Sequence, residues 1–312
     1  MMKKLLLSLA IVGCCAYASA QDRYYYSGPQ LRLAESQFSS EKIADLQGEP
    51  KHSYQGMDCW GETVVSLQHK GFATTYRHNG NSLTKIATFK LGSYAETNHA
   101  NVASFTTQYF AKTDKFPLLF VSQCYKKVVD GQKDVIYVER LANDLKSSKL
   151  VAKIHFKDVS GLYGYAVQWV VDRENKFLYG FGNTVENLSA DNKHRLVKFK
   201  LPTIPTKGKK AATITLSEKD MLENYIIEDY YTGYYKQVGQ GLMIKHGYLY
   251  MPVGLGTAEH PSLLYVWDLA KRKMQNTIDL SKATAGELED CAEYMGELLI
   301  QTQGEMYQLR FQ

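Results

Sequence analysis

Acidic side chains near the starts of several predicted strands are the groups best suited to catalysis in this sequence. Glycosidases need two carboxyl groups that face each other across the bond they cleave. Glu289 and Asp290 form the most suggestive pair, and Asp229 is a further candidate. Neighbouring residues on a strand point to opposite faces, so only one of Glu289 and Asp290 can face a shared site. A solvated acidic edge is the alternative explanation. The other candidate carboxylates are Asp58, Glu228 and Glu293.

Amide, imidazole and tyrosine side chains crowd the segments that precede the predicted first strand of each repeat. Flat rings can cover the apolar patches of a sugar or peptide, while Asn and Gln offer paired donors and acceptors. The segment 217–241 is the strongest local candidate, because a long loop in a compact domain is usually functional. Two alternatives stay open: the side chains only satisfy loop backbone, or the tyrosines form a dimer contact. The residues that we expect to bind a ligand are Gln55, His99, Asn101, Tyr165, Gln168, Tyr234 and Gln240.

The spacing of histidines, serines and glycines argues against three other chemistries. His52 and His99 could share a metal only if the loops brought them together, and no HxH, HxxxH or HExxH spacing supports this. The sequence has no Gly-x-Ser-x-Gly elbow for a nucleophilic serine and no glycine-rich phosphate loop. We therefore expect no metal site and no cofactor.

The elements that would position these side chains follow a repeat of strands along the chain. Five strongly apolar strands recur roughly 50 to 70 residues apart, which is the spacing of propeller blades with loop insertions. They cover residues 62–68, 116–122, 176–181, 247–253 and 297–302. Each is followed by a third strand in which apolar and polar residues alternate, as in a half-buried sheet. These third strands cover residues 72–78, 134–141, 195–201, 263–269 and 305–311.

Four repeats continue into an outer strand, and the fifth does not. The outer strands cover residues 85–91, 150–156, 211–216 and 274–280. A propeller can close its ring by taking the missing strand from the other terminus, and residues 30–38 or 41–46 carry the required alternation. Such closure also protects an exposed strand edge.

The sequence therefore predicts an all-β fold, a five-bladed β-propeller closed by a terminal strand, in one domain over residues 21–312. Another blade number and a β-sandwich are the structural alternatives. Residues 217–226 form the one predicted short helix, with Ser217 as N-cap and Asp220 in place of the capping-box Glu. Glycine-containing turns support the first hairpins. They are Trp60-Gly61, His246-Gly247 and Met295-Gly296.

Several stretches resemble a group of uncharacterised exported β-propeller proteins of Gram-negative gut bacteria, over essentially the whole length after residue 20. They are Gln55-Gly56, residues 86–92, Asn98-His99-Ala100-Asn101 and residues 116–122. Such proteins are sometimes called sialidase-like by fold, but the Ser-x-Asp-x-Gly-x-x-Trp box of true sialidases does not occur here. The resemblance implies an exported propeller and assigns no chemistry.

Residues 1–20 are typical of a secretory signal. Lys3 and Lys4 precede an apolar run, and Ala18-Ser19-Ala20 fits the cleavage pattern of signal peptidase. We therefore expect an exported protein that is periplasmic, cell-surface or extracellular. Residues 11–14 also have the shape of a lipobox, so lipidation of Cys14 is the alternative and the one route to a membrane anchor.

Charge and cysteine content narrow the possible partners. The net charge of +5 becomes +3 without Lys3 and Lys4, and the basic residues are scattered, so nucleic-acid binding is not expected. Cys59, Cys124 and Cys291 remain after the signal, and an odd number leaves at least one thiol unpaired. Three functions stay open: a binding module for a glycan or protein ligand, a glycan-active hydrolase or lyase, and a structural envelope platform.

Overall fold

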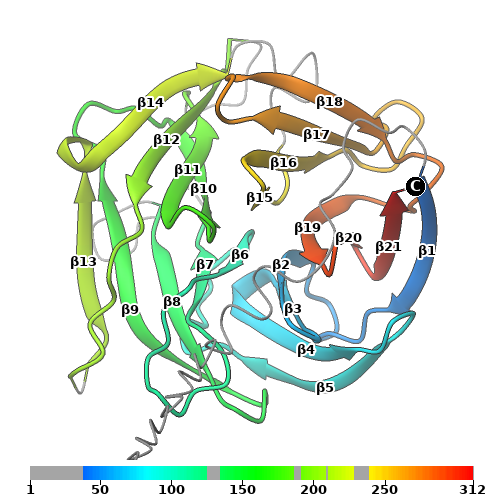
Figure 1. Ribbon diagram of the computed structural model, residues 1–312, viewed down its shortest axis with the longest axis horizontal. Coiled ribbons are helices and arrows are strands. Elements are labelled where there is room, and N and C mark those ends of the chain that lie inside the picture. Colours follow the sequence, from blue (N-terminus) through cyan, green and yellow to red (C-terminus); the bar gives the residue numbers. More distant parts are fainter. Residues whose placement is uncertain (1–37, 125–133, 186–190, 209, 228–238, 312) are drawn as a thin grey trace, which may run out of the picture.

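The described part of the chain forms five small, mainly antiparallel sheets arranged in a ring, which is a five-bladed β-propeller (Figure 1). The computed structural model describes residues 38–124, 134–185, 191–208, 210–227 and 239–311. The first strand of each blade lies nearest the ring centre and the last strand lies at the rim. This confirms the predicted all-β fold and the blade number.

Each blade is built from strands of three to ten residues. Blade I contains β2 (Tyr54–Trp60), β3 (Thr63–Gln68), β4 (Phe72–His78) and β5 (Leu83–Lys90). Blade II contains β6 (Ala103–Phe105), β7 (Leu119–Ser122), β8 (Ile136–Leu141), β9 (Ser148–Lys157) and β13 (Ala212–Ser217). Blade III contains β10 (Tyr165–Asp172), β11 (Phe177–Asn183), β12 (His194–Lys200) and β14 (Met221–Ile227). Blade IV contains β15 (Met243–Lys245), β16 (Tyr248–Val253), β17 (Leu263–Asp268) and β18 (Lys273–Asp279). Blade V contains β19 (Leu288–Tyr294), β20 (Glu297–Thr302), β21 (Glu305–Phe311) and β1 (Phe38–Asp45).

The ring closes as predicted, through pairing of a strand near the start of the chain with the last strand. β1 runs antiparallel to β21, with Phe38 opposite Phe311 and Asp45 opposite Glu305. Of the two predicted closing segments, the strand covers most of 41–46 and only the last residue of 30–38. Ile43 of β1 is buried in the apolar cluster between blades V and I.

Apolar side chains fill the interfaces between neighbouring blades. Five clusters of buried residues each draw on two adjacent blades, so the core is a ring of interfaces around the channel. Strands β2 and β3 are buried along their full length, whereas outer strands such as β18 alternate between exposed and half-buried positions. Strands packed on both faces need apolar residues on both, which explains why the second strands gave the clearest sequence signal. No helix among the described residues is long and apolar enough to span a membrane.

Two expectations around residue 217 are wrong. β13 is not the outer strand of blade III, because it pairs in parallel with β9 and adds a fifth strand to blade II. The outer strand of blade III is β14, which pairs with β12 across residues predicted to be helical. Ser217 and Asp220 do form the expected cap, since the Asp220 carboxylate accepts hydrogen bonds from the Ser217 N–H at 2.8 Å and hydroxyl at 2.7 Å. They cap only one 3-10 turn, η2 (Glu218–Asp220), before the strand begins.

Candidate functional site

A closed belt of hydrogen bonds surrounds the channel at the end where the first strands begin, which we call the loop mouth. The Gly56 N–H donates to the Ala100 carbonyl at 3.0 Å and links blades I and II. The Gln168 amide donates to the Asn101 side chain and to the Gln240 carbonyl, linking blades II, III and IV.

Two further contacts complete the belt through blade V. The Gly241 N–H donates to the Glu289 carbonyl at 2.6 Å. The Gln301 amide donates to the Gln55 carbonyl at 2.5 Å and returns the belt to blade I. All five blades therefore contribute to one polar collar.

The junction of blades V and I carries the most polar part of this collar. Gln303 donates to a carboxylate oxygen of Glu289, and the Tyr54 N–H donates to the Gln303 side-chain oxygen at 3.2 Å. Glu287 accepts a hydrogen bond from the Gln240 amide at 2.7 Å. Gln303 is exposed and Glu287 is half-buried, so these two form the outer lip above the buried Glu289.

Three buried acceptor oxygens at this junction receive no hydrogen bond from any described residue. They are Gln55 Oε1, Glu289 Oε2 and Gln301 Oε1. The residues are between 0% and 4% exposed, so bulk water does not solvate them freely. A buried acceptor without a donor is energetically costly, which favours a donor supplied from outside the described residues.

Two carboxyl groups at the loop mouth, those of Glu287 and Glu289, have raised pKa values. Burial raises the pKa of Glu289 well above its usual range, and the neighbouring charge of Glu287 adds to the rise. Burial also raises the pKa of Glu287, while its hydrogen bond from Gln240 opposes the change. No described Lys or Arg forms an ion pair with either group, and so neither raised pKa is opposed by a described basic side chain.

Beneath the loop mouth, two aspartates tie neighbouring blades together. Asp290 accepts hydrogen bonds from the N–H groups of Met57 at 2.8 Å and Cys291 at 2.9 Å. Asp58 accepts from the N–H groups of Phe105 at 2.6 Å and Cys59 at 2.7 Å. Each carboxylate thus bridges from its own first strand to backbone of the next blade.

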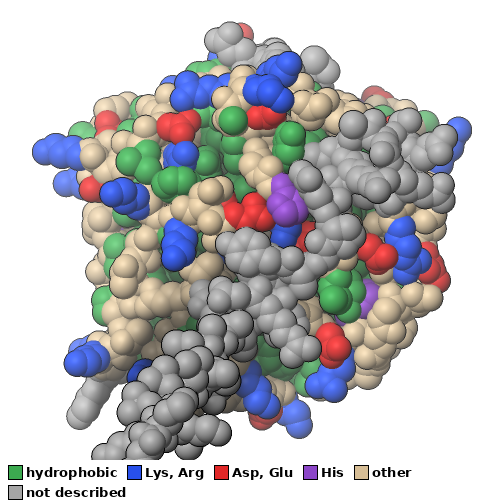
Figure 2. All heavy atoms as spheres, in the orientation of Figure 1, with side chains coloured by type: hydrophobic (Ala, Val, Ile, Leu, Met, Phe, Trp, Pro, Cys, Tyr) green, Lys and Arg blue, Asp and Glu red, His purple; other side chains and the backbone are tan. Residues whose placement is uncertain are grey.

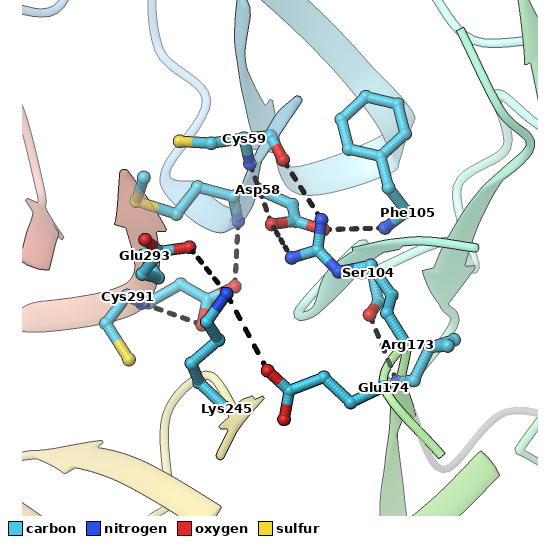
Figure 3. A network of polar contacts seen from close by, with 12 residues as sticks. Asp58, Cys59, Ser104, Phe105, Arg173, Glu174, Lys245, Cys291 and Glu293 are labelled. Carbon is cyan, nitrogen blue, oxygen red and sulfur yellow. Dashed lines mark hydrogen bonds and ion pairs between the residues drawn. The ribbon is translucent and has the colours of Figure 1, made fainter. Parts of the chain in front are cut away.

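The opposite end of the channel, where the first strands turn into the second, is closed by ion pairs (Figure 3). Arg173 points to Asp58 at 3.2 Å and also donates to the Cys59 carbonyl. Lys245 lies between Glu293, at 3.2 Å, and Glu174, at 3.8 Å. Burial raises the pKa of Asp58 even though the Arg173 charge opposes this. We call this group the hairpin-end network.

Little free volume separates the two ends. A cavity of about 10 Å³ lies beside Asp58, Arg173 and Cys291, which is room for about one water molecule. This cavity, lined by described residues, is too small for a ligand larger than water. A larger concavity of about 280 Å³ lies at the turn between β8 and β9, but its charged side chains include Arg140 and Asp114, which pair with each other at 2.6 Å.

The structure brings together five of the predicted site residues and separates others. Gln55, Asn101, Gln168, Gln240 and Glu289 all belong to the loop-mouth collar. His99 does not join it, because its ring faces His69 with the two Nδ1 atoms 3.1 Å apart.

The remaining predicted residues fall in three places. Asp290 lies below the collar as an inter-blade bridge. Tyr165 begins β10, and its side chain is not among the atoms described. Asp229 and Tyr234 lie outside the described residues. Of the segment 217–241, the described first half builds the outer edges of blades II and III and not the mouth, contrary to expectation.

Several site residues were not predicted. Gln301 lies near the end of the second strand β20, and Gln303 directly follows that strand. A propeller brings the loops after its second strands to the same mouth as the loops that enter its first strands, so their position was the available signal. Arg173 and Lys245 lie at hairpins, where charged residues are usually solvated. Only the position of Lys245 at the end of a short buried strand marks it as unusual.

The three described cysteines agree with the expectation of at least one unpaired thiol. Cys59, Cys124 and Cys291 are free and buried, and burial raises the pKa of each thiol. On the face shown in Figure 2, acidic and basic side chains are interspersed and form no single basic patch. Within the described ranges, no three His, Cys, Asp or Glu side chains gather as metal ligands.

No family model and no curated protein matches this chain. Solved structures of other proteins do resemble it, among them two with TM-scores just above 0.5. A glutaminyl cyclase of Myxococcus xanthus is 11% identical with a TM-score of 0.51, and the match covers 88% of this chain and 96% of that one. A tail fiber of the Staphylococcus aureus phage P68 is 10% identical with a TM-score of 0.51, over 92% of this chain and 54% of that one. At these identities the likeness shows the fold alone.

Proposed function

We propose that this propeller binds a glycan at the loop mouth without performing chemistry on it. The observation that supports the proposal is a collar built by all five blades, in which three buried acceptor oxygens receive no hydrogen bond from a described residue. Sugar hydroxyls supply such donors, and the amide side chains of the collar can both donate and accept. The cavity beside Asp58 and Arg173 has room for about one water molecule, so the ligand would rest on the collar.

The compartment forms part of the same proposal. The pattern of residues 1–20 supports export, which would bring the loop mouth into contact with extracellular or periplasmic glycans.

A glycan-active hydrolase or lyase is the second candidate, and the Glu287–Glu289 pair favours it. A carboxyl group with a raised pKa can act as a general acid, and both groups have raised pKa values. The two readings differ in outcome, because an enzyme releases products and a binding module does not.

A thermal-shift screen of the protein lacking residues 1–20, against a panel of glycans, tests both readings. A ligand that binds only the folded state raises the melting temperature by mass action. We expect one glycan class to do so, and analysis of the incubated glycan for shorter products then separates enzyme from binding module. If no glycan stabilises the protein while a protein ligand does, the glycan assignment is wrong.

A further inference from the structure

The concavity of about 280 Å³ at the turn between β8 and β9 lies away from the loop mouth. Strands β6, β7, β8 and β9 pair antiparallel in that order, so the chain runs from the loop mouth, returns to it and leaves again before this turn. The turn therefore lies at the hairpin end of the ring. None of the described residues that line the concavity belongs to the loop-mouth collar, so a ligand bound there would be independent of the proposed glycan site.

Two basic side chains face this concavity from neighbouring strands. Arg140 of β8 lies directly opposite Lys149 of β9, and both residues line the concavity. Like charges directly opposite each other destabilise a sheet. Lys149 is exposed and forms no ion pair with a described residue. One positive charge of the two is therefore left without a counter-charge from the described chain.

Arg140 is held in position with part of its guanidinium group unused. Its Nε and Nη2 atoms donate to the two carboxylate oxygens of Asp114, at 3.0 and 2.6 Å. The Asp114 side chain is only 4% exposed, and the guanidinium carbon lies 5.0 Å from the centre of the Phe110 ring. The Nη1 atom donates to no described residue. An arginine oriented in this way can donate from its remaining edge to a second oxyanion.

Hydrogen bonds between two loops fix the walls of the concavity. Asn143 Oδ1 accepts from the Lys115 N–H at 2.7 Å, and Asn143 Nδ2 donates to the Thr113 carbonyl at 3.0 Å. Ser147 adds a hydroxyl group to the lining. Such a site needs little rearrangement to bind a ligand, which lowers the entropic cost of binding.

A second, smaller concavity adjoins the first and adds positive charge. Lys149 lines both, and Lys207 and Lys210 line the second. The charged side chains of the two linings are therefore four basic groups and one carboxylate, that of Asp114, which already pairs with Arg140. A cleft lined by one sign of charge attracts ligands of the opposite sign. These basic residues are scattered in the sequence, and only strand pairing and packing bring them together.

We infer that the concavity between β8 and β9 binds a small acidic ligand through its oxyanion group, a carboxylate, sulfate or phosphate, between Arg140 and Lys149. Arg140 supplies hydrogen-bond donors in a fixed direction, and Lys149 supplies a flexible point charge. The volume of about 280 Å³ exceeds that of an inorganic anion and is close to the lower limit of about 300 Å³ for small-molecule sites. A ligand about the size of one acidic sugar unit therefore fits.

The test is isothermal titration calorimetry of the protein with glucuronate, inorganic sulfate and glucose, all at constant ionic strength. We expect saturable binding of glucuronate, weaker binding of sulfate, and no binding of glucose, which carries no oxyanion. Lys149→Gln and Arg140→Lys should each weaken glucuronate binding about tenfold, because each removes one of the two groups that contact the oxyanion. Equal binding of sulfate and glucuronate would contradict a ligand that extends beyond its oxyanion.

Lys146→Gln is the matched control, because Lys146 is an exposed lysine of the same turn that does not line the concavity. It should leave glucuronate binding unchanged, whereas an equal loss in Lys146→Gln and Lys149→Gln would mean general charge attraction and would overturn the proposal. Absence of glucuronate binding at millimolar concentrations would overturn it too, as would binding that survives both Lys149→Gln and Arg140→Lys. If Arg140→Lys does not fold, Lys149→Gln at its exposed position decides the question.

Discussion

The carboxylate of Asp290 in blade V accepts a hydrogen bond from the backbone N–H of Met57 in blade I at 2.8 Å, across the junction that closes the ring. Asp58 repeats this arrangement one blade further on, where it accepts from Phe105 at 2.6 Å. A third link of the same kind joins blades II and III, since the Val171 N–H donates to the Ser104 hydroxyl at 3.0 Å. Buried polar side chains thus fix the spacing of neighbouring first strands, and the loop-mouth collar lies above them.

Replacing Asp58 should destabilise the propeller strongly. Asp58→Ala leaves the Arg173 guanidinium without its carboxylate and the Phe105 N–H without its acceptor. Breaking a buried ion pair from one side costs about 3 kcal/mol or more of unfolding free energy. Urea denaturation measures this cost, with Asp144→Ala at an exposed turn as the control. Equal stability of the two variants would mean that Asp58 does not hold the blades together.

Gly241 is expected to tolerate no side chain. A Cβ at this position would lie 1.9 Å from Asp290 Oδ1, so the aspartate bridge or the collar must shift. Overpacking of this kind costs about 1–3 kcal/mol. Gly304→Ala is the matched control, because nothing lies within 4 Å of its Cβ position. Thermal unfolding of both variants should separate them, and similar melting temperatures would contradict the close approach.

His99 should make the fold sensitive to acid. Burial and the facing His69 lower the pKa of His99 to about 4, below the usual value of 6.5. The unfolded chain therefore takes up more protons between these values, and the stability present above pH 6.5 is lost as pH falls towards 4. The variant His99→Gln should show a shallower loss over this window than the wild type. At pH 8 the free energies of unfolding of the two proteins should differ only by the effect of the changed packing. If the two free energies fall in parallel from pH 8 to pH 4, His99 does not have this role.

Alternation and spacing predicted the blades because a strand packed between two neighbours must present apolar residues at regular intervals. The same alternation could not tell which sheet a strand joins. β13 was expected in blade III, but Ile214 packs against the cluster between blades II and III and the strand pairs with β9. The helix prediction was wrong for a related reason. Ser217 and Asp220 do form a local cap, but a cap does not show whether the residues after it continue as a helix or pair as a strand.

The site was predictable to the extent that it lies on loops leading into first strands. Gln168 and Gln240 were found this way, because a propeller gathers those loops at one mouth. The hydrogen bond from Gln301 to the Gln55 carbonyl was not predictable, since the two residues are 246 positions apart and meet only when the ring closes. No sequence pattern linked Arg173 to Asp58 either, although the two side chains form an ion pair in the structure.

The most direct test of the central claim, that the loop mouth is the ligand site, is isothermal titration calorimetry of the glycan that emerges from the thermal-shift screen. Gln303→Ala and Glu287→Ala alter the exposed lip of the loop mouth, whereas Glu62→Ala alters the hairpin end of the same channel. We expect each lip variant to weaken binding about tenfold, corresponding to roughly 1.4 kcal/mol, and Glu62→Ala to bind like the wild type. Unchanged affinity in both lip variants, or a loss only in Glu62→Ala, would place the ligand elsewhere on the propeller.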